Sequence, residues 1–268
     1  MRYFLLVLAL FFFTALPAQA GKAYERVVKS GTITCGYFTW APFLVKDPNT
    51  GILSGPFVDV VEKIGKKLSL KIDWKEEIDF NNMFEGFRNG RYDVICGPLF
   101  PTPARALGAD FTVPLGYAPT YLYARTDDKR FDNKYEMVNK PETRISIIEG
   151  EFSQIVANEK FPAAKKVTAM NIDGTQTFMD VTTNKSDIVA SEPTAPYLFQ
   201  KSNPGKLKRV EGGPIHTGAF SLATPIGEYE LTRMLDIAID NMAEGGEIEK
   251  LMTNGMPEEI KFIYPSKP

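Results

Sequence analysis

Histidine is almost absent from this 268-residue chain, which has only His216, and its two cysteines are Cys35 and Cys96. Zinc sites of the usual kind need three or four histidine, cysteine or carboxylate ligands, so we expect no metal site and no cofactor. A catalytic triad would have to use His216, and no nucleophile motif accompanies it. We therefore expect His216 to be structural.

The sequence also lacks a strong charge of either sign. It has 31 basic and 33 acidic residues, a formal charge of -2. Residues 1–20 hold one basic residue (Arg2) and no acid, so the remainder has 30 basic and 33 acidic residues, or -3. This weak acidic balance gives no electrostatic reason to expect nucleic-acid binding.

Long apolar runs are confined to the N-terminus. Arg2 is followed by an apolar run over residues 4–13 and by the small-x-small sequence Ala18-Gln19-Ala20. This pattern predicts a signal peptide over residues 1–20, cleaved near Ala20, and so a protein exported to the periplasm. An N-terminal anchor helix is the alternative. No later segment is long and apolar enough to cross a bilayer, so we expect a soluble mature protein.

The first part of the mature chain alternates short apolar runs with amphipathic ones. Residues 32–38, 70–75 and 92–97 read as strands. Between them, residues 57–68 place their apolar side chains on one helical face, and residues 83–87 mark a short helix capped by Asn81 or Asn82. This β-α-β-α-β order predicts a parallel sheet flanked by helices.

A second α/β series begins after Arg125. Residues 144–148 and 187–190 read as its strands, with a helix over 152–160 between them. Helices over 230–243 and 246–253 then close the chain. A further helix is expected to start at Pro101-Thr102-Pro103, where Thr102 can act as N-cap.

Two extended segments, 114–124 and 215–222, link the two series. They predict three parts of the mature chain: a first lobe over residues 21–118, a second lobe over 119–216, and a return to the first lobe over 217–268. We expect hinges at residues 117–119 and 216–218, since a few dihedral angles in such crossings can absorb a closure motion.

Four motifs carry a resemblance to a known family. They are Trp40-Ala41-Pro42-Phe43, Gly55-Pro56-Phe57-Val58-Asp59-Val60, the block formed by Gly90–Ile95 with Thr102–Arg105 and Phe111–Pro114, and Lys185–Glu192. In this order and spacing they resemble the family 3 extracellular solute-binding proteins, the polar amino-acid binders of bacterial ABC transporters. The resemblance covers essentially all of residues 25–255.

The resemblance implies a fold and a function. The fold is α/β, the two-lobed type II periplasmic-binding-protein fold, with a mostly parallel sheet flanked by helices in each lobe. The function is capture of a small carboxylate-bearing ligand, an amino acid or a related compound, for an ABC-transporter permease at the inner membrane. It further implies a monomer that is not an enzyme and does not bind nucleic acid.

Four first-lobe residues match the family's ligand contacts. Arg105 would bind the ligand α-carboxylate through the paired donors of its guanidinium, and a surface arginine near a helix start is the alternative. Trp40 and Phe80 would line the cleft, with core packing as the alternative, most seriously for Phe80. Gly97 would let the backbone approach the ligand at the carboxyl end of a strand.

The second lobe supplies Gly150, Glu151 and Glu192. Glu192 would pair with the ligand amine, and a solvated acid at a strand end is the alternative. Glu151 departs from the family, which usually has Ser or Thr there to help hold the carboxylate, and Pro98 departs from a small residue. Because an extra carboxylate repels an anion, either Glu151 points away or the ligand is not an ordinary α-amino acid.

Two other functions stay open. A cyclohexadienyl dehydratase on the same fold would use a glutamate three positions after the second-lobe acid, and Ala195 stands there. That argues against this enzyme, although Glu151 or Glu192 in a dry cleft could act as an acid. The second alternative is a ligand sensor that docks on a membrane receptor instead of a permease.

The two cysteines are expected side by side, since each precedes a glycine at the end of a predicted strand. The periplasm permits a disulfide. Adjacent parallel strands do not readily meet disulfide geometry, so two neighbouring thiols are favoured and a bond between them is the alternative.

Overall fold

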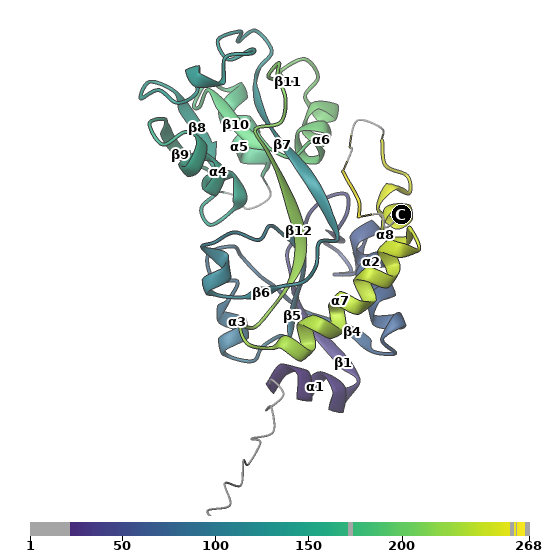
Figure 1. Cartoon of the computed structure of the whole chain (residues 1–268). Coiled ribbons are helices and arrows are strands. Elements are labelled where there is room, and N and C mark those ends of the chain that lie inside the picture. The colour runs from purple at the N-terminus through teal and green to yellow at the C-terminus, as the bar shows by residue number, and fades with distance from the viewer. Residues whose placement is uncertain (1–21, 171–173, 258–259, 261, 266–268) are drawn as a thin grey trace, which may run out of the picture.

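The computed structural model describes residues 22–170, 174–257, 260 and 262–265 as two α/β lobes joined by two long strands (Figure 1). The expected signal peptide, residues 1–20, lies outside the described residues. No helix among the residues that the structure describes has the length and apolar character needed to cross a membrane.

The first lobe is built on three parallel strands in the order β4-β1-β5. Their bounds are β1 Thr32–Tyr37, β4 Lys71–Glu77 and β5 Val94–Leu99, and helices α2 (Pro56–Lys67) and α3 (Glu85–Arg88) connect them in the predicted order. The lobe also contains α1 (Lys22–Ser30) and a small hairpin of β2 (Val45–Lys46) and β3 (Leu53–Ser54).

Two local predictions in this lobe are wrong. The amide side chains of Asn81 and Asn82 do not cap α3; instead the Asp79 carboxylate accepts hydrogen bonds from the N–H groups of both asparagines. The helix expected after Pro101 is only the short 3-10 turn η1 (Arg105–Leu107), although Thr102 Oγ1 does accept a bond from the Arg105 N–H.

The second lobe repeats the parallel arrangement in the order β10-β8-β9. Helix α4 has the predicted bounds, Phe152–Lys160, because Glu151 caps its first turn. The elements of this lobe are β8 Arg144–Ile147, α4, β9 Lys165–Thr168, α5 Thr175–Thr182, β10 Ile188–Ser191, α6 Thr194–Ser202 and β11 Leu207–Arg209, with the 3-10 turn η2 at Tyr135–Met137.

Two long antiparallel strands connect the lobes. Strand β7 (Gly116–Arg125) also pairs with β10 and β11, and β12 (His216–Thr224) also pairs with β5 and with β6 (Asp110–Phe111). The sheet of each lobe therefore combines parallel strands with antiparallel strands at one side. The two predicted hinge segments face each other: Ala118 pairs with Gly218, and Pro119 with Thr217. Their hinge role stays a prediction.

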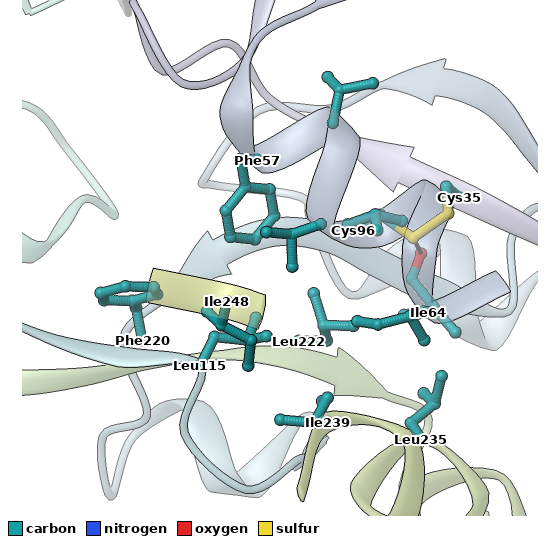
Figure 2. Close-up of a cluster of buried hydrophobic side chains, with 14 of the residues drawn as sticks. Cys35, Phe57, Ile64, Cys96, Leu115, Phe220, Leu222, Leu235, Ile239 and Ile248 are labelled. Atoms are coloured by element: carbon teal, nitrogen blue, oxygen red, sulfur yellow. Dashed lines mark hydrogen bonds between the residues drawn. A yellow bond between two sulfur atoms is a disulfide. The ribbon is translucent and has the colours of Figure 1, made fainter. Parts of the chain in front are cut away.

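Buried apolar side chains form separate clusters in the two lobes. The main first-lobe cluster combines α1, β1 and α2 with β12 and the returning helices α7 (Tyr229–Glu244) and α8 (Glu247–Thr253). Figure 2 shows Phe57 and Ile64 of α2 packed with Leu235 and Ile239 of α7. The main second-lobe cluster lies between residues 122 and 210. The exact lobe boundaries stay a prediction.

The prediction that Cys35 and Cys96 lie side by side is confirmed, and they form a disulfide inside this first-lobe core, which is the outcome that strand geometry disfavoured (Figure 2). Strands β1 and β5 are neighbours, and their register sets Cys35 opposite Val94. Val94 and Cys96 are two residues apart, so they share one face of the sheet. The cysteines are thus diagonal neighbours on that face, with Cα atoms 5.4 Å apart, within the range that a disulfide spans.

Candidate functional site

A cavity of about 530 Å³ lies between the lobes, in the size range of small-ligand sites. It is bordered by the carboxyl ends of parallel strands from both lobes, where ligands bind in open α/β sheets. The loop after β1 contributes Thr39 and Trp40, and the loop after β8 contributes Glu151. The other described lining residues that matter here are Lys46, Phe80, Pro98, Phe100, Arg105, Thr120, Phe152, Phe178, Ala195, Phe199 and, at the end of β10, Glu192.

Arg105 lies on the first-lobe wall with only 4% of its surface exposed. Its guanidinium donates to the Phe100 carbonyl at 2.9 Å and, across the cleft, to the Gly150 carbonyl at 3.1 Å. Its Nε is buried and has no hydrogen-bond partner among the described residues. Burial lowers the pKa of Arg105 to about 10, and the nearby Glu151 carboxylate opposes that shift. The side chain therefore stays charged at neutral pH and has a donor left for a ligand.

Glu192 lies on the second-lobe wall, directly after β10. Its carboxylate accepts hydrogen bonds from the Thr194 N–H at 2.7 Å and the Ala195 N–H at 3.3 Å, at the start of α6. Across the cleft it accepts a bond from Trp40 Nε1 at 3.3 Å. Burial raises the pKa of Glu192, while these three hydrogen bonds act in the opposite direction.

Glu151 lines the cavity and does not point away from it. Its Oε2 accepts a 2.6 Å hydrogen bond from the Ser153 N–H, so the side chain caps α4. A Glu151 carboxylate therefore occupies the start of the helix at which the family resemblance predicted a hydroxyl residue. Of the two alternatives for Glu151, the structure therefore does not support the one in which its side chain points away from the cavity.

The two predicted glycines do not line the cavity. Gly150 has φ 74°, and a Cβ there would come within 2.8 Å of Asn81 Oδ1 in the other lobe. The absence of a side chain at Gly150 thus lets the two lobes approach each other closely. The Gly150 carbonyl accepts the hydrogen bond from the Arg105 guanidinium. At Gly97 a Cβ would lie 2.7 Å from the Phe38 ring, so the space over this glycine is filled by a first-lobe aromatic. Ligand contacts at both positions stay predictions.

Aromatic rings cover much of the cavity wall. Trp40 stacks with Phe43 at 4.5 Å between ring centroids and with Phe262 at 5.6 Å, so much of its ring is already in contact with protein. Phe80 packs on Phe38 within the first lobe. The stack of Phe100 on Phe152, 4.3 Å apart, joins the two lobes. Together with the polar contacts of Arg105 and Glu192, it identifies this structure as the closed arrangement.

Sequence reasoning missed several residues of the site. Phe178 and Phe199 extend the cavity between α5 and α6. Thr120 lies at the crossing of β7, and its buried Oγ1 has no hydrogen-bond partner among the described residues. No local motif marks these residues, because tertiary packing alone brings them to the cleft. His216 lies beside the Phe152 ring and is not one of the cavity-lining residues.

No group of three or more histidine, cysteine, aspartate or glutamate side chains able to hold a metal is present within the described ranges. The chemistry that the cavity offers is charge pairing and apolar contact. One guanidinium faces it from the first lobe and two carboxylates face it from the second.

Comparison with known proteins connects this geometry to a family. The sequence profile of the bacterial extracellular solute-binding proteins, family 3, matches residues 33–254. The L-cystine-binding protein TcyA of Bacillus subtilis is 24% identical over 247 residues, which are 91% of this chain and 88% of that protein. A probable amino-acid ABC transporter-binding protein of Haemophilus influenzae is 34% identical over 112 residues; the match spans 41% of this chain and 43% of that protein, less than half its length.

Solved structures share the fold. An ancestral amino acid-binding protein, described as a precursor of cyclohexadienyl dehydratase, superposes with a TM-score of 0.74 at 23% identity, over 86% of this chain and 97% of that one. A cysteine-binding protein from Campylobacter jejuni gives a TM-score of 0.74 at 18% identity, over 88% and 94% of the two chains. At these identities the likeness establishes the two-lobed fold.

Proposed function

Because the chain belongs to the bacterial extracellular solute-binding proteins, family 3, we propose that it captures an amino acid between its two lobes outside the cytoplasm and delivers it to an ABC-transporter permease. Arg105 binds the ligand carboxylate, and Glu192 binds an ammonium group from the opposite lobe. Trp40, Phe80 and Phe100 contact the rest of the ligand. In this proposal the signal peptide directs the chain to the periplasm, where it acts as a monomer.

One observation carries the proposal: a buried guanidinium, that of Arg105, and the half-buried Glu192 belong to different lobes and line the same cavity. The unpartnered Nε of Arg105 supports a ligand acceptor at that position, because a buried donor left without a partner costs stability. A zwitterion brings the complementary charge to each wall. Such a ligand contacts both lobes, so it binds the closed form better than the open one and shifts the population towards closure.

The test is a thermal-shift screen over the twenty amino acids, polyamines, organic acids and aromatic acids, followed by calorimetry on those that raise the melting temperature. A ligand at about 100 times its dissociation constant adds roughly 2.7 kcal/mol to the free energy of unfolding. The proposal expects amino acids to give the largest shifts. Stabilisation by organic acids or polyamines alone, with no amino acid active, contradicts it.

The dehydratase alternative has one observation in its favour, the burial that raises the pKa of Glu192, as a general acid requires. Against it, the cavity-lining residue three positions later is Ala195, which has no proton to donate. Incubation with prephenate separates the two functions by the absorbance of phenylpyruvate. We expect no turnover, and a Glu192-dependent rate would establish the enzyme instead.

A further inference from the structure

The formal charges of the side chains around the cavity do not sum to zero. Among the described lining residues they are Lys46, Arg105, Glu151 and Glu192. Lys46 is matched at the rim by Glu77, whose carboxylate lies 2.8 Å from the lysine Nζ. When they are ionised, the other three give one positive and two negative charges, a sum of -1. An enclosed site with this sum favours a ligand that brings the missing positive charge, because an uncompensated charge is costly away from water.

Both carboxylates are fixed on the cavity wall. Glu151 accepts the Ser153 N–H at the start of α4, and Glu192 accepts the Thr194 N–H at the start of α6. A helix N-terminus favours a negative charge nearby, and at Glu192 the hydrogen bonds at the start of α6 oppose the rise in pKa that burial causes. These bonds hold both groups at the cavity, where they lie opposite Arg105 of the first lobe.

We propose that Glu151 sets the charge class of the ligand, and that the site selects amino acids of net charge +1. The inference rests on the proposed function, since it assumes an amino acid in the cavity. The ligand carboxylate offsets Arg105, its α-ammonium group offsets one glutamate, and a second cationic group offsets the other. The count is the same whichever glutamate the α-ammonium group meets.

The rest of the wall suits a cation on an aliphatic stem. Trp40, Phe80 and Phe100 offer apolar surface in the same cavity, and aromatic rings attract cations as well as hydrocarbon. The buried Nε of Arg105 remains available for the ligand carboxylate. A neutral amino acid would fill the same space but leave one carboxylate in the closed cavity without a counter-charge.

L-arginine and L-citrulline test this inference, because they have nearly the same shape and differ by one positive charge. Calorimetry on the wild type is expected to give an affinity roughly a hundredfold higher for arginine, equivalent to about 2.7 kcal/mol. Glu151→Gln is expected to reduce this ratio roughly tenfold or more, because it removes the charge and keeps the size. Glu151→Asp retains the charge and is expected to retain most of the preference.

Glu149→Gln is the matched control. It removes one acid two residues away that is exposed and is not one of the described cavity-lining residues, so the ratio is expected to stay at the wild-type value. Equal binding of arginine and citrulline by the wild type overturns the inference and leaves amino-acid binding intact. An unchanged ratio in Glu151→Gln, or an equal loss of both ligands, overturns the role of Glu151. Absence of binding by any amino acid refutes the proposed function itself.

Discussion

At the scale of single residues, the proposed site depends on the Arg105 guanidinium of the first lobe and the two carboxylates, Glu151 and Glu192, of the second. Arg105 is buried, donates to carbonyls of both lobes and keeps an unpartnered Nε. Glu192 receives three hydrogen bonds, including one from Trp40 of the other lobe. These groups bring the lobes together around a polar ligand, and each can be tested separately.

Arg105→Lys is expected to weaken binding of the best amino-acid ligand roughly tenfold or more, which is about 1.4 kcal/mol. A lysine ammonium group cannot reach the Phe100 and Gly150 carbonyls while offering a ligand the paired donors of a guanidinium. Calorimetry measures the loss, and circular dichroism checks the fold. Arg88→Lys, on the exposed surface of α3, is the control and should bind like the wild type. Unchanged affinity in Arg105→Lys would remove the carboxylate anchor.

From the burial of Glu192 we expect the open–closed equilibrium of the ligand-free protein to depend on pH. Burial in the closed form raises its pKa above the ordinary value, which applies when the cleft is open. A raised pKa stabilises the closed form below the ordinary pKa, and this stabilisation is lost as the pH rises through the higher value. The ligand-free protein should therefore expand as the pH rises above the ordinary glutamate pKa of about 4.3, as measured by its radius of gyration. In Glu192→Gln this pH dependence should largely disappear; if it persists unchanged, another group controls it.

At the scale of elements, the sequence predicts strands and helices wherever apolar periodicity is strong. The helix over residues 152–160 has the expected bounds, and the strands β1, β5, β8 and β10 agree within two residues. Predictions of short elements are less accurate: α3 lacks its expected cap, and the 3-10 turn η1 stands where a longer helix is expected. The contact of Phe262 with Trp40 depends on the return of a distant segment, which no local pattern announces.

The same dependence on contacts between distant segments explains why local motifs predict part of the site but not the disulfide. Trp40, Phe80, Arg105, Glu151 and Glu192 line the cavity, and their motifs are local in sequence. The disulfide depends instead on the register of β1 against β5, which sets Cys96 diagonally across from Cys35. Neighbouring strands are predictable from β-α-β order, but a shift of two residues along them is not.

The disulfide closes a loop with a sequence separation of 61, so it should stabilise the first lobe. Replacing both cysteines by alanine is expected to lower the free energy of unfolding by about 2–4 kcal/mol, mainly because the unfolded chain regains freedom. Urea denaturation of the oxidised protein and the double variant measures the difference. With reductant present the wild type should approach the variant. Equal stability of both oxidised forms would contradict a structural role for the bond.

At the scale of the whole molecule, each lobe has its own buried core, and one cavity lies between the lobes. The antiparallel ribbon of β7 and β12 connects the lobes (Figure 1). The contacts that cross the cleft include Trp40 with Glu192, Arg105 with Gly150, and Phe100 with Phe152. Rotation at the ribbon of β7 and β12 would break and remake these contacts, and this is the motion that a ligand would bias.

Tryptophan fluorescence should report this motion through one residue. Trp40 bonds across the cleft to Glu192, whereas Trp74 bonds to Glu62 within the first lobe. Ligand is therefore expected to change the emission of the wild type and of Trp74→Phe, but to leave Trp40→Phe nearly unchanged. A ligand signal of full size in Trp40→Phe would place the moving contact elsewhere.

Small-angle scattering tests the central claim, closure of the two lobes around an amino acid, most directly. The radius of gyration of the wild type is measured at neutral pH with and without a saturating amount of the amino acid that binds most tightly. We expect the ligand to reduce it to the value calculated from the closed structure, and to do so in Arg105→Lys only at higher concentration. A bound ligand that leaves the radius of gyration unchanged would contradict the account.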